Sequence, residues 1–254
     1  MLIVKSLLQI QLNKKTWKII LKDKYEKYFF ALVYAKARKN IVFLCFEVPA
    51  MTSEENIKRA LDYISGHWQR QNNELDRQTK FVYEIDNLDF ILTICKTKNV
   101  DLNYALHRWY NFNCARHHEY FFLKNGAIKE ENTKHLTIDF YLNNVPFDLK
   151  TSVYPKKFEP NVDLTKRENK NELIRWFYEN QSTEIRQHFE NRLFIVCENL
   201  AGKSNFEAIE EKIKAFLEYS KKNGFNKIEI NNRLIFSDVI WVKKQENELH
   251  RLKT

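Results

Sequence analysis

Three residues near the middle of the chain, Asp139, Asp148 and Lys150, have types and spacing that suit metal-assisted hydrolysis of phosphodiesters. Proteins hold Mg²⁺ with a few carboxylate oxygens, together with waters and substrate phosphate. A metal bound in this way stabilises charge on the phosphate and lowers the pKa of an attacking water. The ammonium group of Lys150 would orient that water and offset charge in the transition state. The spacing therefore predicts a metal-dependent active site, provided that the fold brings the two aspartates together.

The segment around these residues has the pattern of a β-hairpin. Two extended runs, 135–142 and 145–154, are joined by Asn143–Asn144, and asparagine tolerates the positive φ of a two-residue turn. Side chains alternate between the two faces of a strand, so one face is expected to pack into the core and the other to carry the aspartates and Lys150. The apolar face consists of Ile138, Phe140, Leu142, Val145, Phe147 and Leu149.

A two-residue turn also predicts which residues oppose each other. Leu142 would pair with Val145, and counting back puts Asp139 opposite Asp148. Opposed Cβ atoms on one face lie about 4.5–5.5 Å apart, so the two carboxylates repel each other unless a cation lies between them. The alternative is a solvated hairpin face with an Asp–Lys pair, because a D/E-x-K triplet alone is a weak signal. Glu210–Glu211–Lys212 also matches that triplet, within a predicted helix.

This pattern resembles that of the PD-(D/E)xK nuclease superfamily, which includes many restriction endonucleases. The matching residues are Asp139 in TIDFYLNN and Asp148–Leu149–Lys150 in VPFDLKTS. The resemblance covers about residues 101–223, and Ile138, rather than Pro, precedes the first aspartate, a departure that the superfamily tolerates. It implies an α/β fold with a restriction-endonuclease-like core, a mixed central sheet flanked by helices, in the order helix, strands, helix, strand, helix. The first core strand is unclear and is sought in AIKEE.

The resemblance also implies a set of metal ligands. Asp139, Asp148 and the backbone carbonyl of Leu149 are expected to bind Mg²⁺, for which Mn²⁺ would substitute. Many such nucleases add a glutamate from the first core helix. Glu119 is the candidate, because it is the only acidic residue between Leu102 and Lys129; a surface glutamate is the alternative.

The expected elements place the hairpin in the second part of the chain, residues 99–254, which is predicted to be the catalytic core. A helix would start at Asp101, which caps it, and end before Asn125–Gly126, since Gly suits the left-handed position after a helix. After the hairpin we expect a helix over 170–189, a buried strand in RLFIVCEN, a helix over 206–223 and a C-terminal hairpin that turns at Asn231–Asn232.

The first part, residues 1–98, is predicted to be an α/β region that grips DNA, reads its sequence or forms a dimer. Its expected elements are strands over 16–21 and 41–48, a helix over 24–38, a helix that starts near Thr52 and runs to about residue 71, and a hairpin formed by FVYEI and FILTICKT.

Composition narrows the class of partner. The 254 residues include 42 Lys and Arg against 33 Asp and Glu, a net charge of +9, which favours polyanionic partners such as nucleic acid. An anionic membrane surface would also be attracted, and the alternative to both is a charged surface that only keeps the protein in solution. Lys156 and Lys157 follow the second hairpin strand and would contact DNA phosphates, unless they belong to a solvated loop. No run approaches the roughly 18 apolar residues of a membrane span, so no membrane partner is expected. The cysteines Cys45, Cys95, Cys114 and Cys197 are far apart, which indicates reduced thiols of a cytoplasmic protein.

Two other patterns are set aside. His117–His118 cannot easily share one ion, because neighbouring residues on a helix do not face each other, so a partly buried or DNA-facing histidine is expected. Ala201–Gly202–Lys203–Ser204 lacks the upstream glycine of a phosphate loop, which favours a turn and helix cap.

The leading hypothesis is thus a Mg²⁺-dependent endonuclease for double-stranded DNA, in particular a sequence-specific type II restriction enzyme. Cutting both strands calls for two active sites, so a homodimer is expected by analogy with the superfamily. The alternatives are an RNA nuclease, a nuclease toxin and a catalytically silent module that binds nucleic acid.

Overall fold

The computed structural model describes residues 51–66, 72–132, 137–160, 162–180 and 190–243, together with the backbone of four strands before residue 46. The chain divides into two compact units, residues 1–51 and 52–254. Residues 52–98, which the sequence assigned to the N-terminal region, belong to the second of these units. The division by role, with recognition or dimerisation in 1–98 and catalysis in 99–254, stays a prediction.

The first unit contains an antiparallel sheet of four strands in the order β1-β2-β3-β4. The strands predicted over 16–21 and 41–48 are confirmed in part, as β2 and β4. The helix predicted over 24–38 is wrong where it overlaps β3, because that segment pairs with both of its neighbours in the sheet; the rest of it lies outside the described residues. The strands are β1 Gln9–Asn13, β2 Thr16–Lys22, β3 Phe29–Leu32 and β4 Phe43–Cys45.

The second unit opens with short helices. The helix predicted near Thr52 is confirmed as α1, although Ser53 caps it through a bond from the Asn56 N–H, and it ends far before residue 71. The hairpin predicted from FVYEI and FILTICKT is wrong, because these segments form η2 and α3. The side chain of Asn87, between the two segments, caps α3 by accepting hydrogen bonds from the N–H groups of Asp89 and Phe90. The elements are α1 Glu54–Arg59, η1 Ala60–Asp62, α2 Asn73–Gln78, η2 Lys80–Tyr83 and α3 Leu88–Lys98.

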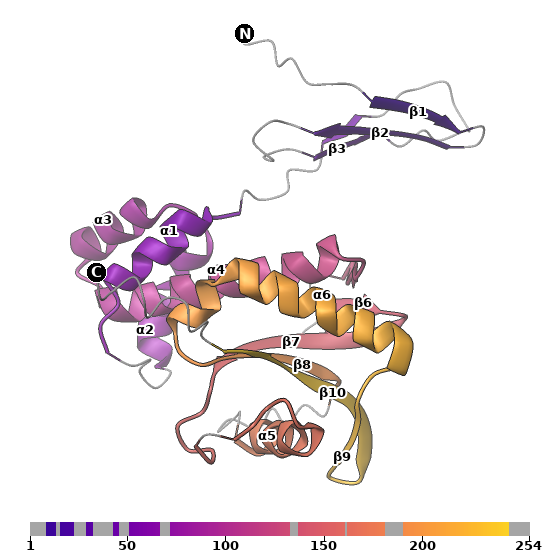
Figure 1. The fold of residues 1–254 in the computed structure, drawn as a ribbon. Helices are drawn as coiled ribbons and strands as arrows, with labels where there is room; N and C mark the ends of the chain where they lie inside the picture. The colour runs from indigo at the N-terminus through magenta and orange to yellow at the C-terminus, as the bar shows by residue number, and fades with distance from the viewer. Residues whose placement is uncertain are drawn as a thin grey trace, which may run out of the picture. The chain divides into compact units, whose positions relative to one another are not determined.

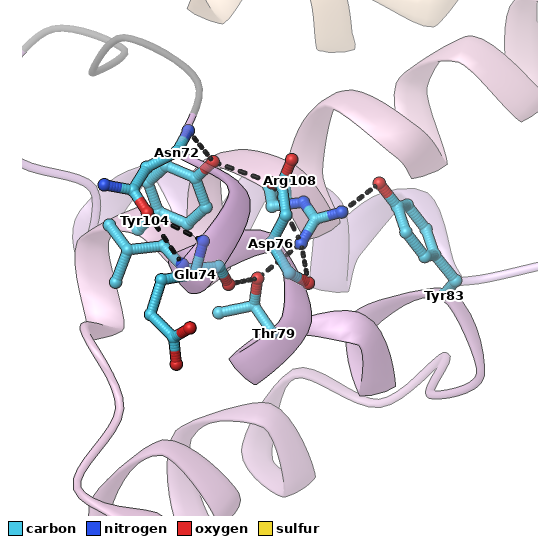
Figure 2. Close-up of polar contacts among 8 residues, drawn as sticks. Asn72, Glu74, Asp76, Thr79, Tyr83, Tyr104 and Arg108 are labelled. Carbon is cyan, nitrogen blue, oxygen red and sulfur yellow. Dashed lines mark hydrogen bonds and ion pairs between the residues drawn. The ribbon is translucent and has the colours of Figure 1, made fainter.

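A polar cluster joins these helices to the long helix α4, Leu102–Lys124 (Figure 2). The guanidinium of Arg108 on α4 forms an ion pair with Asp76, at 3.2 Å, and donates to the Thr79 and Tyr83 hydroxyls. The Tyr104 hydroxyl donates to the same Asp76 carboxylate. This helix begins and ends as predicted, with the Asp101 side chain as its N-cap and Asn125 and Gly126 directly after it.

The centre of the second unit is a mixed sheet of six strands in the order β5-β6-β7-β8-β10-β9. β5, β6 and β7 are antiparallel neighbours, whereas β7, β8 and β10 run parallel. The last hairpin turns at Asn231–Asn232 as predicted, with positive φ at both residues. The strands are β5 Ile128–Lys129, β6 Phe140–Leu142, β7 Val145–Val153, β8 Arg192–Cys197, β9 Lys227–Ile230 and β10 Arg233–Val242.

Helices cover both faces of this sheet. α4 and α6, Phe206–Asn223, lie on one face and α5, Arg167–Asn180, on the other (Figure 1). Alternate residues of β8 serve the two layers: Leu193 and Ile195 pack under α4 and α6, and Phe194 and Val196 under α5. The predicted helix over 170–189 is thus confirmed up to residue 180, and 181–189 lie outside the described residues. The fold class is mixed α/β.

Two features bear on class and partners. Among the described helices, none is long and apolar enough to cross a bilayer. Cys95, Cys114 and Cys197 are buried free thiols.

The segment Ala201–Ser204, predicted to be a turn and helix cap, forms a short 3-10 helix, η3. The N-cap of α6 is the next residue, Asn205.

Candidate active site

The hairpin that carries the predicted site forms with the expected turn. Asn143 and Asn144 have φ of 48° and 63°, the left-handed values of a two-residue turn that matches the strand twist. Leu142 pairs with Val145 and Phe140 with Phe147, so the predicted register is correct from the turn as far as Phe140. Phe140, Leu142 and Phe147 are buried, which fixes the apolar face toward α4 and α6.

Counted back from the turn, the pairing of the two strands ends at Phe140, directly after Asp139 in the chain. The Asp139 N–H donates to the Phe147 carbonyl at 2.9 Å. The Asp148 N–H donates to the carbonyl of Asn191, the residue directly before β8, at 3.0 Å. The Asp139 side chain then bonds to the next strand itself, since its Oδ2 accepts the Leu149 N–H at 2.7 Å. The two aspartates are therefore brought together by a side chain that bonds to the backbone, not by the direct opposition that the sequence predicted.

Asp148 is buried, with 3% of its surface exposed, and both of its oxygens have cationic partners. Oδ1 lies 2.5 Å from the Lys150 ammonium, whose side chain is 43% exposed, and Oδ2 lies 2.9 Å from Nε of the buried Arg192. Arg192 is the residue of β8 that pairs with Asp148. A buried carboxylate is stable when it is paired and hydrogen-bonded in this way.

Sequence reasoning missed Arg192. Its guanidinium lies over the ring of Tyr178 on α5, 5.2 Å from the ring centroid. A signal was present, because Arg192 is the only charged residue of the buried strand RLFIVC. A cation in such a strand requires a buried partner.

Asp139 is in different surroundings from Asp148. Burial raises the pKa of its carboxyl group, the negative charges of Asp148 and Glu119 raise it further, and the Leu149 N–H and Lys150 oppose the rise. Among the described residues, Asp139 makes no ion pair within 4 Å. It is thus a largely buried carboxylate without a cation of its own.

Glu119 comes from the C-terminal part of α4 and is close enough to act on the pKa of Asp139. Its carboxylate lies 3.2 Å from the Lys129 ammonium on β5. The structure therefore gathers Glu119, Asp139, Asp148 and Lys150 in one region, from α4, the start of β6 and β7. Lys156 and Lys157 are exposed in the turn after β7 and take no part in this cluster.

The cluster is not a closed metal cage. Among the residues that the structure describes, no three His, Cys, Asp or Glu side chains are grouped tightly enough to hold an ion. Asp139 and Asp148 offer hard oxygen donors of the kind that Mg²⁺ prefers, and Mg²⁺ needs only one or two carboxylates when waters and substrate phosphate complete its shell. The donor set fits such an open site.

The adjacent histidines have structural roles. His117 Nε2 lies 2.8 Å from the Thr52 carbonyl oxygen, and His118 bonds to the Thr151 hydroxyl and to the Lys203 carbonyl. Burial lowers the pKa of His118 to about 3. The neutral ring therefore donates from Nε2 to the Lys203 carbonyl and accepts at Nδ1 from Thr151.

Comparisons of the chain with protein-family models, with curated proteins and with solved structures find no match.

Proposed function

We propose that the chain is a Mg²⁺-dependent endonuclease that hydrolyses phosphodiester bonds of double-stranded DNA. The observation that carries the proposal is the state of Asp139, a largely buried carboxylate that lies in the negative field of Asp148 and Glu119. Ionising such a group costs free energy that a bound cation would offset. Perturbed carboxylates of this kind concentrate at functional sites.

The order of the elements supports the same proposal. α4 is followed by β5, β6 and β7, then by α5, β8 and α6. This is the order of helix, strands, helix, strand, helix that the resemblance to PD-(D/E)xK nucleases implies. β5, Ile128–Lys129, lies in AIKEE, where the first core strand was sought. A restriction-endonuclease-like core is therefore part of the proposal.

Asp139, Asp148 and the Leu149 carbonyl would hold the ion, with Glu119 as a further ligand, directly or through water. When bound, the ion stabilises charge on the phosphate and lowers the pKa of an attacking water; Mn²⁺ would substitute for Mg²⁺. Lys150 would exchange its contact with Asp148 for the phosphate or the attacking water, because its side chain is partly exposed. Arg192 would hold the Asp148 carboxylate in place during that exchange, through its contact with Oδ2.

The more specific form of the proposal is a sequence-specific type II restriction enzyme that acts as a homodimer in the cytoplasm. The net charge of +9 favours DNA, and Lys156 and Lys157 are exposed where they could contact phosphates. Dimerisation follows from the need to cut two strands, by analogy with the superfamily.

One observation favours a second candidate, a catalytically silent module that binds nucleic acid. Both oxygens of Asp148 are already paired, with Lys150 and with Arg192. If these pairs are permanent, Asp148 has no oxygen left for an ion, and the cluster only stabilises the hairpin.

The two candidates separate in a cleavage assay with mixed plasmid and phage DNA, in Mg²⁺ or in EDTA. The variants are Asp148→Asn and Lys150→Ala, and the matched control is Lys212→Ala, which alters the exposed lysine of the Glu210–Glu211–Lys212 triplet in α6. We expect discrete Mg²⁺-dependent fragments from the native chain and from Lys212→Ala, and none from the two site variants.

Each other outcome has a definite meaning. A metal-dependent smear would reject sequence specificity and favour a nonspecific nuclease or toxin. Cleavage of RNA alone would reject DNA as the substrate. Binding that is sensitive to salt, without cleavage of either nucleic acid, would reject the enzyme and leave the silent module.

A further inference from the structure

A large hollow lies beyond the carboxyl ends of the parallel strands β7 and β8. Its volume is about 1060 Å³, and its walls include residues 151–156 after the proposed active site and residues 198–200 after β8. Ligands of open α/β sheets bind in the crevice outside the carboxyl ends of the strands, and pockets for small molecules measure roughly 300–1,000 Å³. The hollow is therefore placed and sized for a ligand.

The floor of the hollow carries a buried cation, Lys203, which is 8% exposed. Its ammonium donates to Asn111 Oδ1 at 2.8 Å, and among the described residues no carboxylate lies within 4 Å of it. Burial lowers the pKa of this amine. A buried charge is costly unless it is paired, so an anion that entered the hollow would gain a strong, charge-assisted contact here.

The structure holds Lys203 firmly in this place. The Lys203 carbonyl accepts a hydrogen bond from His118 on α4. Asn111 Oδ1 accepts a hydrogen bond from the Lys203 ammonium, and the Asn111 side chain is itself anchored by donating to the His107 carbonyl. Gly202 lets η3 lie close to β8, since a Cβ there would come within 3.2 Å of the Cys197 Cβ. The cation is thus preorganised, which lowers the cost of binding.

The aromatic walls of the hollow indicate which group could accompany the anion. Tyr154 and Phe158 line the hollow and are partly buried. Their rings contact each other edge to face, with centroids 6.0 Å apart, and are held from behind by Trp241 and Trp176. Aromatic rings of this kind stack on nucleobases without regard to sequence. At the rim, the exposed Lys156 adds positive charge, and the exposed Glu198 is the one carboxylate among the described lining residues.

We propose that this hollow is a binding site for a nucleotide, with its phosphate on Lys203 and Lys156 and its base against Tyr154 and Phe158. The nucleotide is either free or one unit of a single strand. None of these residues belongs to the proposed metal site, so binding requires no metal and stands apart from cleavage. Val153 lies three residues beyond Lys150 in β7, roughly 10 Å along the strand, so a strand could also reach from one site to the other.

The test is calorimetric titration in EDTA with deoxyadenosine monophosphate, with deoxyadenosine and with inorganic phosphate. The native protein should bind the nucleotide at least about tenfold more tightly than either part alone. Lys203→Met should weaken nucleotide binding by about tenfold or more, because the replacement keeps the length of the side chain but removes its charge. The matched control is Lys222→Met, at an exposed lysine in the last turn of α6, which should bind as the native chain does.

Two further measurements cover the remaining outcomes. If Lys203→Met does not fold, Lys156→Met at the exposed rim replaces it, with an expected loss of about threefold. A single strand of eight deoxyadenylate nucleotides tells whether the bound nucleotide is free or part of a strand. If only the strand binds, and the same variant weakens that binding, the site takes one nucleotide of a single strand. Equal binding of nucleotide and nucleoside, unchanged affinity in the lysine variant, or no binding of nucleotide or strand would each overturn the proposal. Because EDTA prevents cleavage, these results do not depend on whether the chain is a nuclease.

Discussion

Two polar clusters in the second unit contain an arginine paired with an aspartate, and they differ in what surrounds the pair. In the helical cluster, Arg108 and Asp76 lie 3.2 Å apart, and hydroxyl groups complete their hydrogen bonds (Figure 2). In the sheet cluster, Arg192 and Asp148 lie 2.9 Å apart, but Asp139 lies beside them without a cation of its own.

The difference between the two clusters shows which feature indicates an active site. An arginine paired with an aspartate occurs in both clusters, and such a pair by itself stabilises contacts between elements. Only the sheet cluster holds an unpaired, largely buried carboxylate among other carboxylates, which is costly unless it has a use. Substitutions in the sheet cluster should therefore separate activity from stability, whereas those in the helical cluster should change stability alone.

The largest expected effect is the loss of cleavage in Asp139→Asn. A metal contributes several kcal/mol of transition-state stabilisation, and each 1.4 kcal/mol is tenfold in rate, so cleavage should fall by about 1000-fold or more. The melting temperature should not fall, because the substitution removes a carboxylate that burial and two neighbouring charges disfavour. Rates of DNA cleavage and thermal unfolding of the same samples provide the check. A variant that cleaves normally would remove Asp139 from the site.

The next effect is on stability, in Arg192→Met. Removing one partner of a buried ion pair costs about 3–5 kcal/mol, because the other charge is left uncompensated. Lys150 remains beside Asp148, so the lower end of this range is expected from urea denaturation. Arg192→Lys should recover part of the loss. If Arg192→Met is as stable as the native protein, Asp148 does not depend on Arg192.

In the helical cluster, Arg108→Met should cost about 2 kcal/mol, the worth of charge-assisted hydrogen bonds at a site that is not fully enclosed. The side chains of Arg108 and Asp76 are 11% and 22% exposed, so Asp76 regains some water when the arginine is lost. Cleavage per folded molecule should stay unchanged, as measured at a temperature well below unfolding. A specific loss of cleavage would show that the helical cluster also serves the site.

These effects concern features that the sequence revealed to different degrees. The hairpin was predictable because its strand period of two, its Asn–Asn turn and its apolar face are local signals. Arg192 was not, since its contact with Asp148 depends on the pairing of β7 with β8, strands separated by α5. The segment FILTICKT was mistaken for a strand from its β-branched residues. The buried residues of the helix that contains it, α3, are Leu88, Ile91 and Cys95, which have helical spacing, and that period was the better signal.

A smaller effect is the pH dependence of stability that Asp139 contributes in EDTA. The pKa of its carboxyl group is raised in the folded state above its ordinary value of 3.8. The folded protein therefore binds this proton more tightly than the unfolded chain, and stability is lost as pH rises through the folded pKa. Asp139→Asn should match the native protein below about pH 3.8 and become the more stable of the two above it. Urea denaturation at several pH values gives the difference, and a gap that widens toward acid would contradict the raised pKa.

The smallest expected effect is at the hairpin turn, in Asn144→Gly. Asn144 is exposed, with a φ of 63°, and glycine adopts this conformation without steric strain but loses more entropy on folding. The relief of steric strain and the larger loss of entropy nearly cancel, so the free energy of unfolding should change by no more than about 0.5 kcal/mol. Cleavage should be unchanged. Asn144→Val is the contrast, because a β-branched residue at positive φ costs roughly 1–2 kcal/mol. Equal stability of the two variants would mean that the turn does not hold this φ. The register that brings Asp139 to Leu149 would then depend on the apolar face of the hairpin and not on its turn.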